Sequence, residues 1–547
     1  MASTTLSDGG GPQCAGGAAR DTGRWRLRAL AVLAALLTTA VSARAEPVNI
    51  VFIMADDHAV QAVSSYGHAI SALAPTPNID RIAEDGIVFL NSFVANSICG
   101  PSRAAILTGR YGHANGFMQN GDTFDASQWT WPRALKSAGY QTAIIGKWHL
   151  SRTPEGLDFD YWMTFDDQGE YYNPEMLSPR GSELIEGYAT DLVTDLTLEW
   201  LEQGRDPDRP FLLMMHHKAP HRNWMPALRH ANRFAATEFP VPPTYFDDYE
   251  GRRAAAAQTM SISRDMHEGH DLKMTTAVGS TELRYDPWPG SFERMTPEQR
   301  RTWDAAYSER NDAMNRADPG GREMALWKYQ RYLQDYLATV AAVDESVGAV
   351  LDYLERTGLA DDTLVVYTSD QGFYLGEHGW FDKRFMYEES LRTPLLMKLP
   401  GRIPAGSATR LLVQNIDYAA TLLDFAGVET PEAMHGRSFM DIALGTPPSD
   451  WRTSIYYQYF EYPGFHSVKR HYGLRDDRYK LIHFYHDIDA WELYDLQADP
   501  GEVRNLIDDP LHAERIERMR LELERARERY AVPDPGIADP AAPGQQP

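Results

Sequence analysis

Four short runs of continuous apolar side chains set the strongest limit on how this chain can fold. They are VNIVFIMA, QTAIIG, PFLLMM and TLVVYTS, within residues 48–58, 141–149, 210–221 and 362–372. Runs without polar alternation are typical of parallel strands that are buried on both faces. Helical patterns lie between them, and the longest covers 332–356. The alternation predicts an α/β fold, with a large mixed, mostly parallel sheet sandwiched by helices.

Each of the four apolar runs ends in side chains that can take part in chemistry. These are Asp56 with Asp57, Lys147 with His149, His217 with His221, and Asp370 with Gln371. Ligands of open α/β sheets bind beyond the carboxyl ends of the strands, so these ends should converge on one edge. Every strand must exit into a polar loop, and that simpler interpretation suffices for any single exit. Four exits rich in Asp, Lys and His favour a functional site.

Carboxylates dominate two of the four exits and indicate a metal site. Asp56, Asp57 and Asp370 supply carboxylate oxygens, and Gln371 supplies an amide oxygen. Hard oxygen ligands suit Ca²⁺ or Mg²⁺ and suit soft metals poorly. Adjacent carboxylates also repel each other unless a cation lies between them. Asp-Asp pairs are common in turns, so the distant Asp370–Gln371 pair carries much of this prediction.

The N-terminus has the pattern of a secretory signal peptide over residues 1–45. Three arginines, an apolar run and an A-x-A ending follow one another (Arg24, Arg26, Arg28; 29–41; Ala43 to Ala45). An uncleaved membrane anchor is the alternative. Cleavage predicts a periplasmic or secreted protein without stable membrane association. It would also remove Cys14 and leave Cys99 as a lone thiol, which is reactive, bridged to another molecule, or buried and inert.

The remaining chain divides by composition. Residues 46–445 are predicted to form a catalytic domain, with a polar insertion at about 244–315 that carries short helices over the site or is a disordered loop. Alternating strands and a charged helix predict a smaller C-terminal α+β subdomain at 446–531, built on an antiparallel sheet. A Pro/Ala/Gly-rich flexible tail covers 532–547. The formal net charge of −24 argues against nucleic-acid binding.

Cys99 precedes a predicted helix. Pro101 is a good first helical residue, and the helical pattern ends at Gly109. Backbone N–H groups and the helix dipole favour an anion at such an N-terminus. Arg103 adds a guanidinium group, whose paired N–H donors can bind two oxygens of a sulfate or phosphate. A thiolate nucleophile is conceivable, but the sequence shows no Cys/His/Asn arrangement of a cysteine protease.

The segment CGPSRAAILTGR, which begins at Cys99, resembles the signature of the type I sulfatases of the alkaline phosphatase superfamily. Flanking motifs agree in order from about residue 48 to 506. In that family the C-x-P-S-R cysteine is oxidised to formylglycine by a formylglycine-generating enzyme. The resemblance therefore implies an alkaline-phosphatase-like fold, one Ca²⁺ per chain, and Cys99 as the precursor of an aldehyde-hydrate nucleophile.

The resemblance also implies roles for individual residues. The calcium ligands would be Asp56, Asp57, Asp370, Gln371 and modified Cys99, with Gln371 standing where many members have Asn. The catalytic set would be Cys99, Arg103, Lys147, His149, His221 and Lys383. In it, Arg103 orients the hydrate, Lys147 and His149 contact the hydrate and the ester, His221 assists the leaving oxygen, and Lys383 binds sulfate. His217 is interpreted as structural.

The substrate suggested by the resemblance is a sulfated carbohydrate of glycosaminoglycan or mucin type, such as N-acetylglucosamine-6-sulfate. His378 and Trp380, which follow SDQGFYLGE, are candidate sugar contacts beside Lys147, His221 and Lys383. Trp380 is equally consistent with a core position. Two other functions stay open: a phosphodiester or phosphonate monoester hydrolase of the same superfamily, and a non-catalytic glycan-binding protein.

Overall fold

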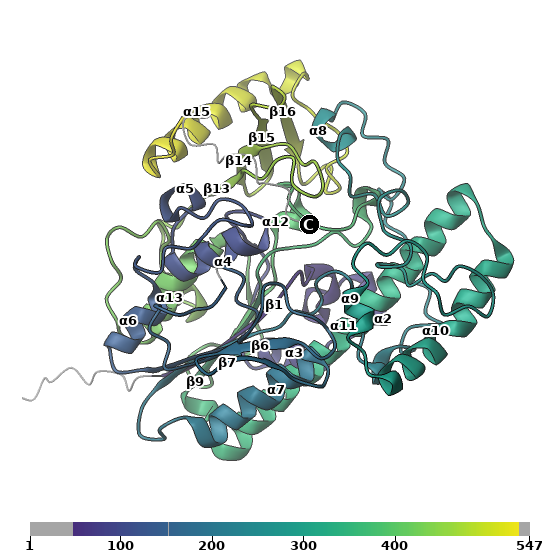
Figure 1. Cartoon of the computed structure of the whole chain (residues 1–547). Coiled ribbons are helices and arrows are strands. Elements are labelled where there is room, and N and C mark those ends of the chain that lie inside the picture. Colours follow the sequence, from purple (N-terminus) through teal and green to yellow (C-terminus); the bar gives the residue numbers. More distant parts are fainter. Residues whose placement is uncertain (1–47, 151, 535–547) are drawn as a thin grey trace, which may run out of the picture. The chain divides into compact units, whose positions relative to one another are not determined.

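A ten-stranded mixed sheet forms the centre of the structure, which is a computed structural model (Figure 1). The structure describes residues 48–150 and 152–534, all within one compact unit. The predicted signal peptide at 1–45 and most of the predicted tail lie outside these residues. Among the described residues, no helix combines the length and apolar character needed to cross a membrane.

The order of the ten strands is β11-β2-β10-β9-β1-β8-β4-β5-β6-β7. Their bounds are β1 Asn49–Ala55, β2 Ile87–Phe89, β4 Gln141–Gly146, β5 Tyr161–Phe165, β6 Glu175–Ser178, β7 Gly181–Leu184, β8 Phe211–His216, β9 Thr363–Ser369, β10 Leu395–Lys398 and β11 Ser407–Thr409. A separate pair joins β3 Ser92–Phe93 to β12 Val413–Gln414.

The four apolar runs of the sequence are four adjacent strands at the centre of the sheet. They pair as β9-β1-β8-β4, and every pair is parallel. The predicted mostly parallel sheet is confirmed, and the carboxyl ends of these strands share one edge. Antiparallel pairing occurs toward the margins, where β10 pairs with β9 and β2, and β6 pairs with β5 and β7.

Alternate residues of the central strands face two different helical layers. In β1, Ile50, Phe52 and Met54 pack in one apolar cluster with residues of α4, α6 and α13. Val51, Ile53 and Ala55 pack in another with residues of α3, α7 and α11. The bounds are α3 Pro77–Glu84, α4 Cys99–Thr108, α6 Trp131–Ser137, α7 Ala189–Glu199, α11 Gly321–Thr357 and α13 Tyr418–Phe425. Burial on both faces explains why these strands lack polar alternation.

Helix α11 is longer than the sequence pattern predicts. It begins at Gly321 rather than near Tyr332, and it spans 37 residues. Its first turns are mixed in polarity, but Tyr329 is fully buried in the cluster that surrounds Trp224. Tertiary packing therefore extends the helix beyond the stripe that periodicity reveals.

The C-terminal part forms a four-stranded antiparallel sheet in sequence order, as predicted. The strands are β13 Ser454–Tyr459, β14 His471–Asp476, β15 Tyr479–Phe484 and β16 Ala490–Asp495, followed by α15 Ala513–Arg529. Leu481 and Leu493 pack with Ile516 of α15, and the same cluster includes Ala105 of α4. This sheet is thus continuous in packing with the helix that begins at Cys99.

The predicted insertion at 244–315 contains α8 Arg253–Ala256, α9 Gly290–Glu293 and most of α10 Pro297–Ala317. It is not a loose loop. Met260, Ile262, Leu272 and Met274 are fully buried and belong to the same cluster as Trp224. The alternative of a disordered surface loop is therefore wrong, because this segment contributes to the core.

Candidate active site

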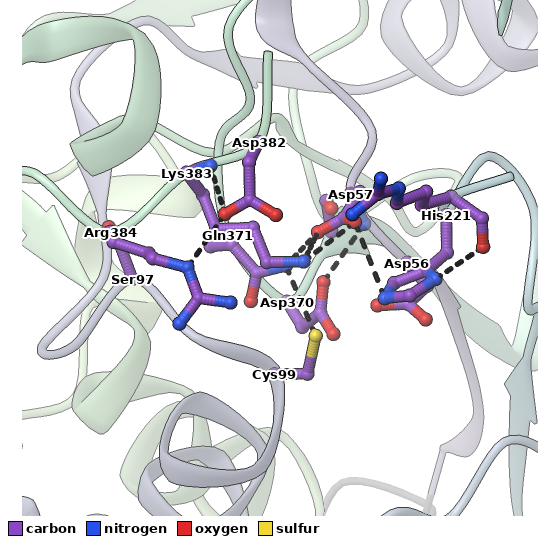
Figure 2. Close-up of polar contacts among 12 residues, drawn as sticks. Asp56, Asp57, Ser97, Cys99, His221, Asp370, Gln371, Asp382, Lys383 and Arg384 are labelled. Atoms are coloured by element: carbon purple, nitrogen blue, oxygen red, sulfur yellow. Dashed lines mark hydrogen bonds and ion pairs between the residues drawn. The ribbon is translucent and has the colours of Figure 1, made fainter. Parts of the chain in front are cut away.

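The carboxyl ends of β1, β4 and β9 bring the predicted acidic and basic residues into one buried cluster. Asp56 and Asp57 follow β1, Lys147 follows β4 and Asp370 follows β9. One carboxylate oxygen from each of Asp56, Asp57 and Asp370 lies within 4.8 Å of the others. Figure 2 shows these carboxylates on one side of the sulfur of Cys99. We call Asp56, Asp57, Asp370, Gln371 and Cys99 the acidic centre.

Helix α4 is joined directly to two of these strand ends. Ser102 Oγ donates to the carbonyl of Asp370. Arg103 Nε donates to Asp370 Oδ2 at 3.0 Å, and its Nη1 donates to the carbonyl of Lys147 at 3.0 Å. The Ser and Arg of the motif therefore fix the start of the helix against β9 and β4. This linkage places Cys99, the first residue of α4, at the acidic centre.

Gly100 lets the chain pack closely at this point. Its N–H donates to Asn120 Oδ1 at 3.0 Å, and a Cβ here would lie 2.5 Å from a ring carbon of Phe117. Cys99 itself is only 1% exposed. Its sulfur, a carboxylate oxygen of Asp56 and a ring nitrogen of His221 lie within 4.8 Å of one another.

Two lysines neutralise part of the acidic centre. Lys147 Nζ forms an ion pair with Asp56, and Lys383 Nζ lies 2.7 Å from both carboxylate oxygens of Asp57. Burial alone would raise the pKa of Asp56, but the charges of Lys147, His221 and Arg103 hold it well below its usual value. Asp56 is therefore an anion at neutral pH.

The other two carboxylates are less completely compensated. Burial and the charge of Asp56 raise the pKa of Asp57 to about 6, against the opposing effect of Lys383. Burial and Asp56 likewise raise the pKa of Asp370 to about 8, although Arg103 is close. Three buried carboxylates that resist ionising together need a further positive charge.

The donor set fits a hard divalent cation. Asp56 Oδ1 and Gln371 Oε1 are both buried and have no hydrogen-bond partner. Buried polar oxygens without partners are costly, and carboxylate and amide oxygens are the ligands that Ca²⁺ prefers. Gln371 Nε2 instead donates to Asp57 and lies 3.8 Å from the sulfur of Cys99. The donor chemistry of these residues therefore suits a hard divalent cation such as Ca²⁺.

Two histidines present nitrogens to the acidic centre. His221 Nδ1 donates to the carbonyl of Arg222 at 2.8 Å, so Nε2 is the free nitrogen, 3.7 Å from Asp57 Oδ2. His149 Nε2 accepts from Gln168 Nε2 at 2.8 Å, which leaves a buried Nδ1 without a partner. Burial, then the charge of Lys147, lowers the pKa of both histidines well below the usual value. His217 contacts Ser346 at 3.3 Å and lies in the interior, in agreement with a structural role.

The structure does not bring His378 and Trp380 into the centre. Both are completely buried. His378 Nδ1 lies 2.7 Å from Asp247, and the indole N–H of Trp380 donates to Tyr249 at 2.8 Å. Both side chains are thus enclosed by other residues of the protein, and the direct sugar contact expected of them stays a prediction.

Several residues of the site carry no clear signal in the sequence. Gln168 accepts from Lys147 Nζ at 2.5 Å and so links this lysine to His149. Arg384 forms ion pairs with Asp382 at 2.8 Å and Glu461 at 2.6 Å. Glu461 Oε2 accepts from the N–H of Asn120, the residue that holds Gly100. The run FDKR next to Lys383 was a usable hint, whereas Gln168 and Glu461 lie in ordinary polar loops.

The sequence of this chain matches those of known sulfatases. The sulfatase family profile matches residues 48–428, and a profile described as N-sulphoglucosamine sulphohydrolase, C-terminal, matches 376–529. An N-acetylglucosamine-6-O-sulfatase of Bacteroides thetaiotaomicron is 49% identical over 494 residues, which cover 89% of this chain and 87% of that protein.

Solved structures agree with the sequence matches. One, a complex with its substrate D-glucosamine-2-N,6-O-disulfate, has a TM-score of 0.86 and 47% identity and covers 90% of this chain and 100% of its own. A phosphonate monoester hydrolase from Silicibacter pomeroyi has a TM-score of 0.65 at 22% identity, covering 88% and 96%, and shares the fold. The family match, the near-half identity and the assembled site establish that this chain belongs to the sulfatase family and is a sulfuric ester hydrolase.

Proposed function

We propose that the protein removes the 6-sulfate from a sulfated glucosamine unit of a glycosaminoglycan-type glycan, using formylglycine at position 99 and one calcium ion. The observation that carries the substrate class is the 49% identity to an N-acetylglucosamine-6-O-sulfatase over 89% of the chain. A similar structure holds D-glucosamine-2-N,6-O-disulfate as its substrate. The buried acidic centre supports the mechanism.

Calcium would be held by Asp56, Asp57, Asp370 and Gln371, where two oxygens lack partners. When bound, it would polarise a sulfate oxygen and lower the pKa of the attacking hydroxyl. Formylglycine would supply two hydroxyls on one carbon, one to attack sulfur and one whose deprotonation expels the sulfate.

The chain's own cations bind and orient the sulfate. Lys147 and Lys383 already face carboxylates of the acidic centre, and both are buried, so their charges act with little screening by water. Arg103 lies within 3.7 Å of Asp56 and 3.0 Å of Asp370, and it fixes the side chain at position 99 through α4. These fixed charges favour the transition state, where negative charge spreads over the transferring group.

Proton transfer falls to His221. Its Nδ1–H is held by the carbonyl of Arg222, so it is the doubly protonated ring that would give a proton, from Nε2, to the leaving sugar oxygen. The burial that lowers its pKa also makes its protonated form a strong acid. His149, fixed by Gln168, has a buried Nδ1–H without a partner, which would be available to donate to an oxygen of the substrate.

The N-terminal pattern of residues 1–45 supports export to the periplasm or beyond. A formylglycine-generating enzyme is then the partner needed for maturation, because Cys99 is the chain's unmodified precursor. We further propose 46–445 as the catalytic domain and 446–531 as the C-terminal subdomain.

The test is sulfate release from N-acetylglucosamine-6-sulfate by protein produced with a formylglycine-generating enzyme. Peptide mass at position 99 measures conversion, and a matched batch made without that enzyme is the control. We expect turnover in proportion to conversion and little turnover of phosphonate monoesters or phosphodiesters. Faster turnover of those esters would identify the superfamily alternative, and full conversion without turnover of any ester would leave a glycan-binding protein.

A further inference from the structure

A hollow of about 550 Å³ has Arg222, the residue that follows His221, in its lining. Most of its wall comes from the 244–315 segment, and the rest comes from three other parts of the chain. We call it the side hollow and define it by Arg222, Arg264, His267, Tyr285, Trp288 and Phe465.

Two lining residues of the side hollow lie close in the chain or in space to neighbours of His221 and Lys383. Arg222 is the immediate neighbour of His221 and accepts its Nδ1–H through its carbonyl. His466, a further lining residue, lies 3.2 Å from Asp382, which is the neighbour of Lys383. The side hollow is therefore linked to the candidate site through the chain neighbours of His221 and Lys383, and a glycan that extends from the site in this direction would reach it.

The hollow is lined by aromatic rings in an arrangement suited to a sugar. Tyr285 and Phe465 are 67% and 64% exposed, more than the other aromatic residues in the described part of the chain. The ring of Trp288 lies between Phe465, with ring centres 6.3 Å apart, and His267, at 5.4 Å. Exposed rings that converge on a concave surface are unfavourable in water unless a ligand covers them.

One cation of the hollow has no ion pair in the part of the chain that the structure describes, and one lining carboxylate, Asp265, accepts there only from the N–H of Ser261 at 2.8 Å. Arg222 is paired with Asp271 through two hydrogen bonds of 2.7 Å, and Lys328 is paired with Glu268 at 3.0 Å. Arg264 is exposed, and no described residue forms an ion pair with it. In a chain of net charge −24, an unpaired arginine over a recess attracts anions locally.

We propose that the side hollow is a glycan subsite in which Arg264 binds an anionic group that the substrate carries beyond the scissile sulfate. This inference rests on the proposed function. The anionic group is a second sulfate on the same sugar or the carboxylate of a neighbouring uronic acid. Tyr285, Trp288 and Phe465 contact the sugar faces, and Arg264 supplies preference for the charged substrate.

The experiment compares three probes with the matured enzyme. N-acetylglucosamine-6-sulfate has no second anion, glucosamine-2-N,6-O-disulfate has one on the same sugar, and a uronic acid-linked N-acetylglucosamine-6-sulfate has one on the neighbour. For R264A, we expect the ratio of kcat/KM for an anionic probe to that for the first probe to fall about tenfold. The probe whose ratio falls identifies the source of the anion.

Two matched variants control the result. R180A removes an exposed arginine from the turn between β6 and β7, and it should leave both ratios unchanged. R264K keeps the positive charge but lacks the paired N–H groups of the guanidinium. It should retain part of the preference for the anionic probe. If R264A leaves both ratios as in the wild type, the subsite is refuted even though the 6-sulfatase activity stands. If the wild type releases no 6-sulfate from any probe, the proposed function fails instead.

Discussion

Two buried clusters of charge occupy different parts of this protein, and they differ in how completely their atoms are paired. In the C-terminal part, Lys480 lies 3.0 Å from Glu388 and 2.8 Å from Glu502, and Arg475 also binds Glu388. Glu502 Oε2 accepts from the backbone N–H of Glu388 at 2.6 Å. We call these four residues the C-terminal cluster.

The acidic centre is left incomplete by comparison. Asp56 Oδ1 and Gln371 Oε1 have no partner, whereas the carboxylate oxygens of the C-terminal cluster are paired. A buried cluster that satisfies its own atoms holds a structure together, and one that leaves oxygens unpaired is prepared for a ligand. Changes in the acidic centre should therefore affect activity, and changes in the C-terminal cluster should affect stability.

The largest effect should come from removing the nucleophile precursor. We expect C99A to lower kcat/KM for N-acetylglucosamine-6-sulfate by roughly 10⁴-fold, because no other side chain at the centre replaces it. The free energy of unfolding should change by less than about 1 kcal/mol, as measured by denaturant titration. A variant that kept more than a tenth of the activity would remove position 99 from the mechanism.

Breaking the C-terminal cluster should lower the stability of the protein and leave its activity nearly unchanged. K480M leaves Glu388 and Glu502 without their shared lysine, so the free energy of unfolding should fall by about 3–5 kcal/mol. Activity per folded molecule at low temperature should stay within about twofold. The matched control is K136M, which breaks the exposed Lys136–Asp160 pair and should cost less than about 1 kcal/mol. Equal losses of unfolding free energy in K480M and K136M would contradict the stabilising role of the C-terminal cluster.

Calcium should distinguish the two clusters by ligand-dependent stability. At calcium about 100 times its Kd, the wild type should gain about 2.7 kcal/mol over chelated protein. D370N should lose most of that gain, because it removes a ligand charge, while K480M should keep it. Thermal unfolding with calcium or chelator measures the difference, and a full calcium response in D370N would place the ion elsewhere.

The smallest effect concerns Glu492, whose neighbours are hydroxyls. Burial raises its pKa to about 7, and Tyr494 and Tyr387 donate to it at 2.8 and 2.9 Å. Because the folded state holds this proton more tightly than the unfolded chain, the contribution of Glu492 falls as pH rises from about 5 to 7. The stability of the wild type relative to E492Q should drop by about 2 kcal/mol over that range. A flat difference would mean that Glu492 is ionised throughout.

Much of the fold and the site could be predicted from the sequence because both depend on short contiguous segments of the chain. β1, β4, β8 and β9 are mostly apolar, since both of their faces are covered, and their polar exits mark the shared edge. The motif at Cys99 is contiguous because Ser102 and Arg103 must reach Asp370 and Lys147 from one helical turn.

The rest of the site depends on contacts between distant segments. Glu461 reaches Arg384, and Gln168 reaches Lys147, through folding that no spacing reveals. Trp380 illustrates the converse, because an aromatic beside a motif can turn inward and pack on Tyr249. The aromatics that are exposed beside the site, Tyr285 and Phe465, come from segments without periodicity.

The burial of Cys99 has a consequence for how active molecules are made. A side chain that is 1% exposed, on a helix fastened to two strand ends, is out of reach of any second enzyme after folding. The conversion proposed for Cys99 must therefore compete with folding while the chain is newly synthesised. A molecule that folds before Cys99 is converted stays inactive. The specific activity of a preparation therefore reports the fraction of molecules that were converted before they folded.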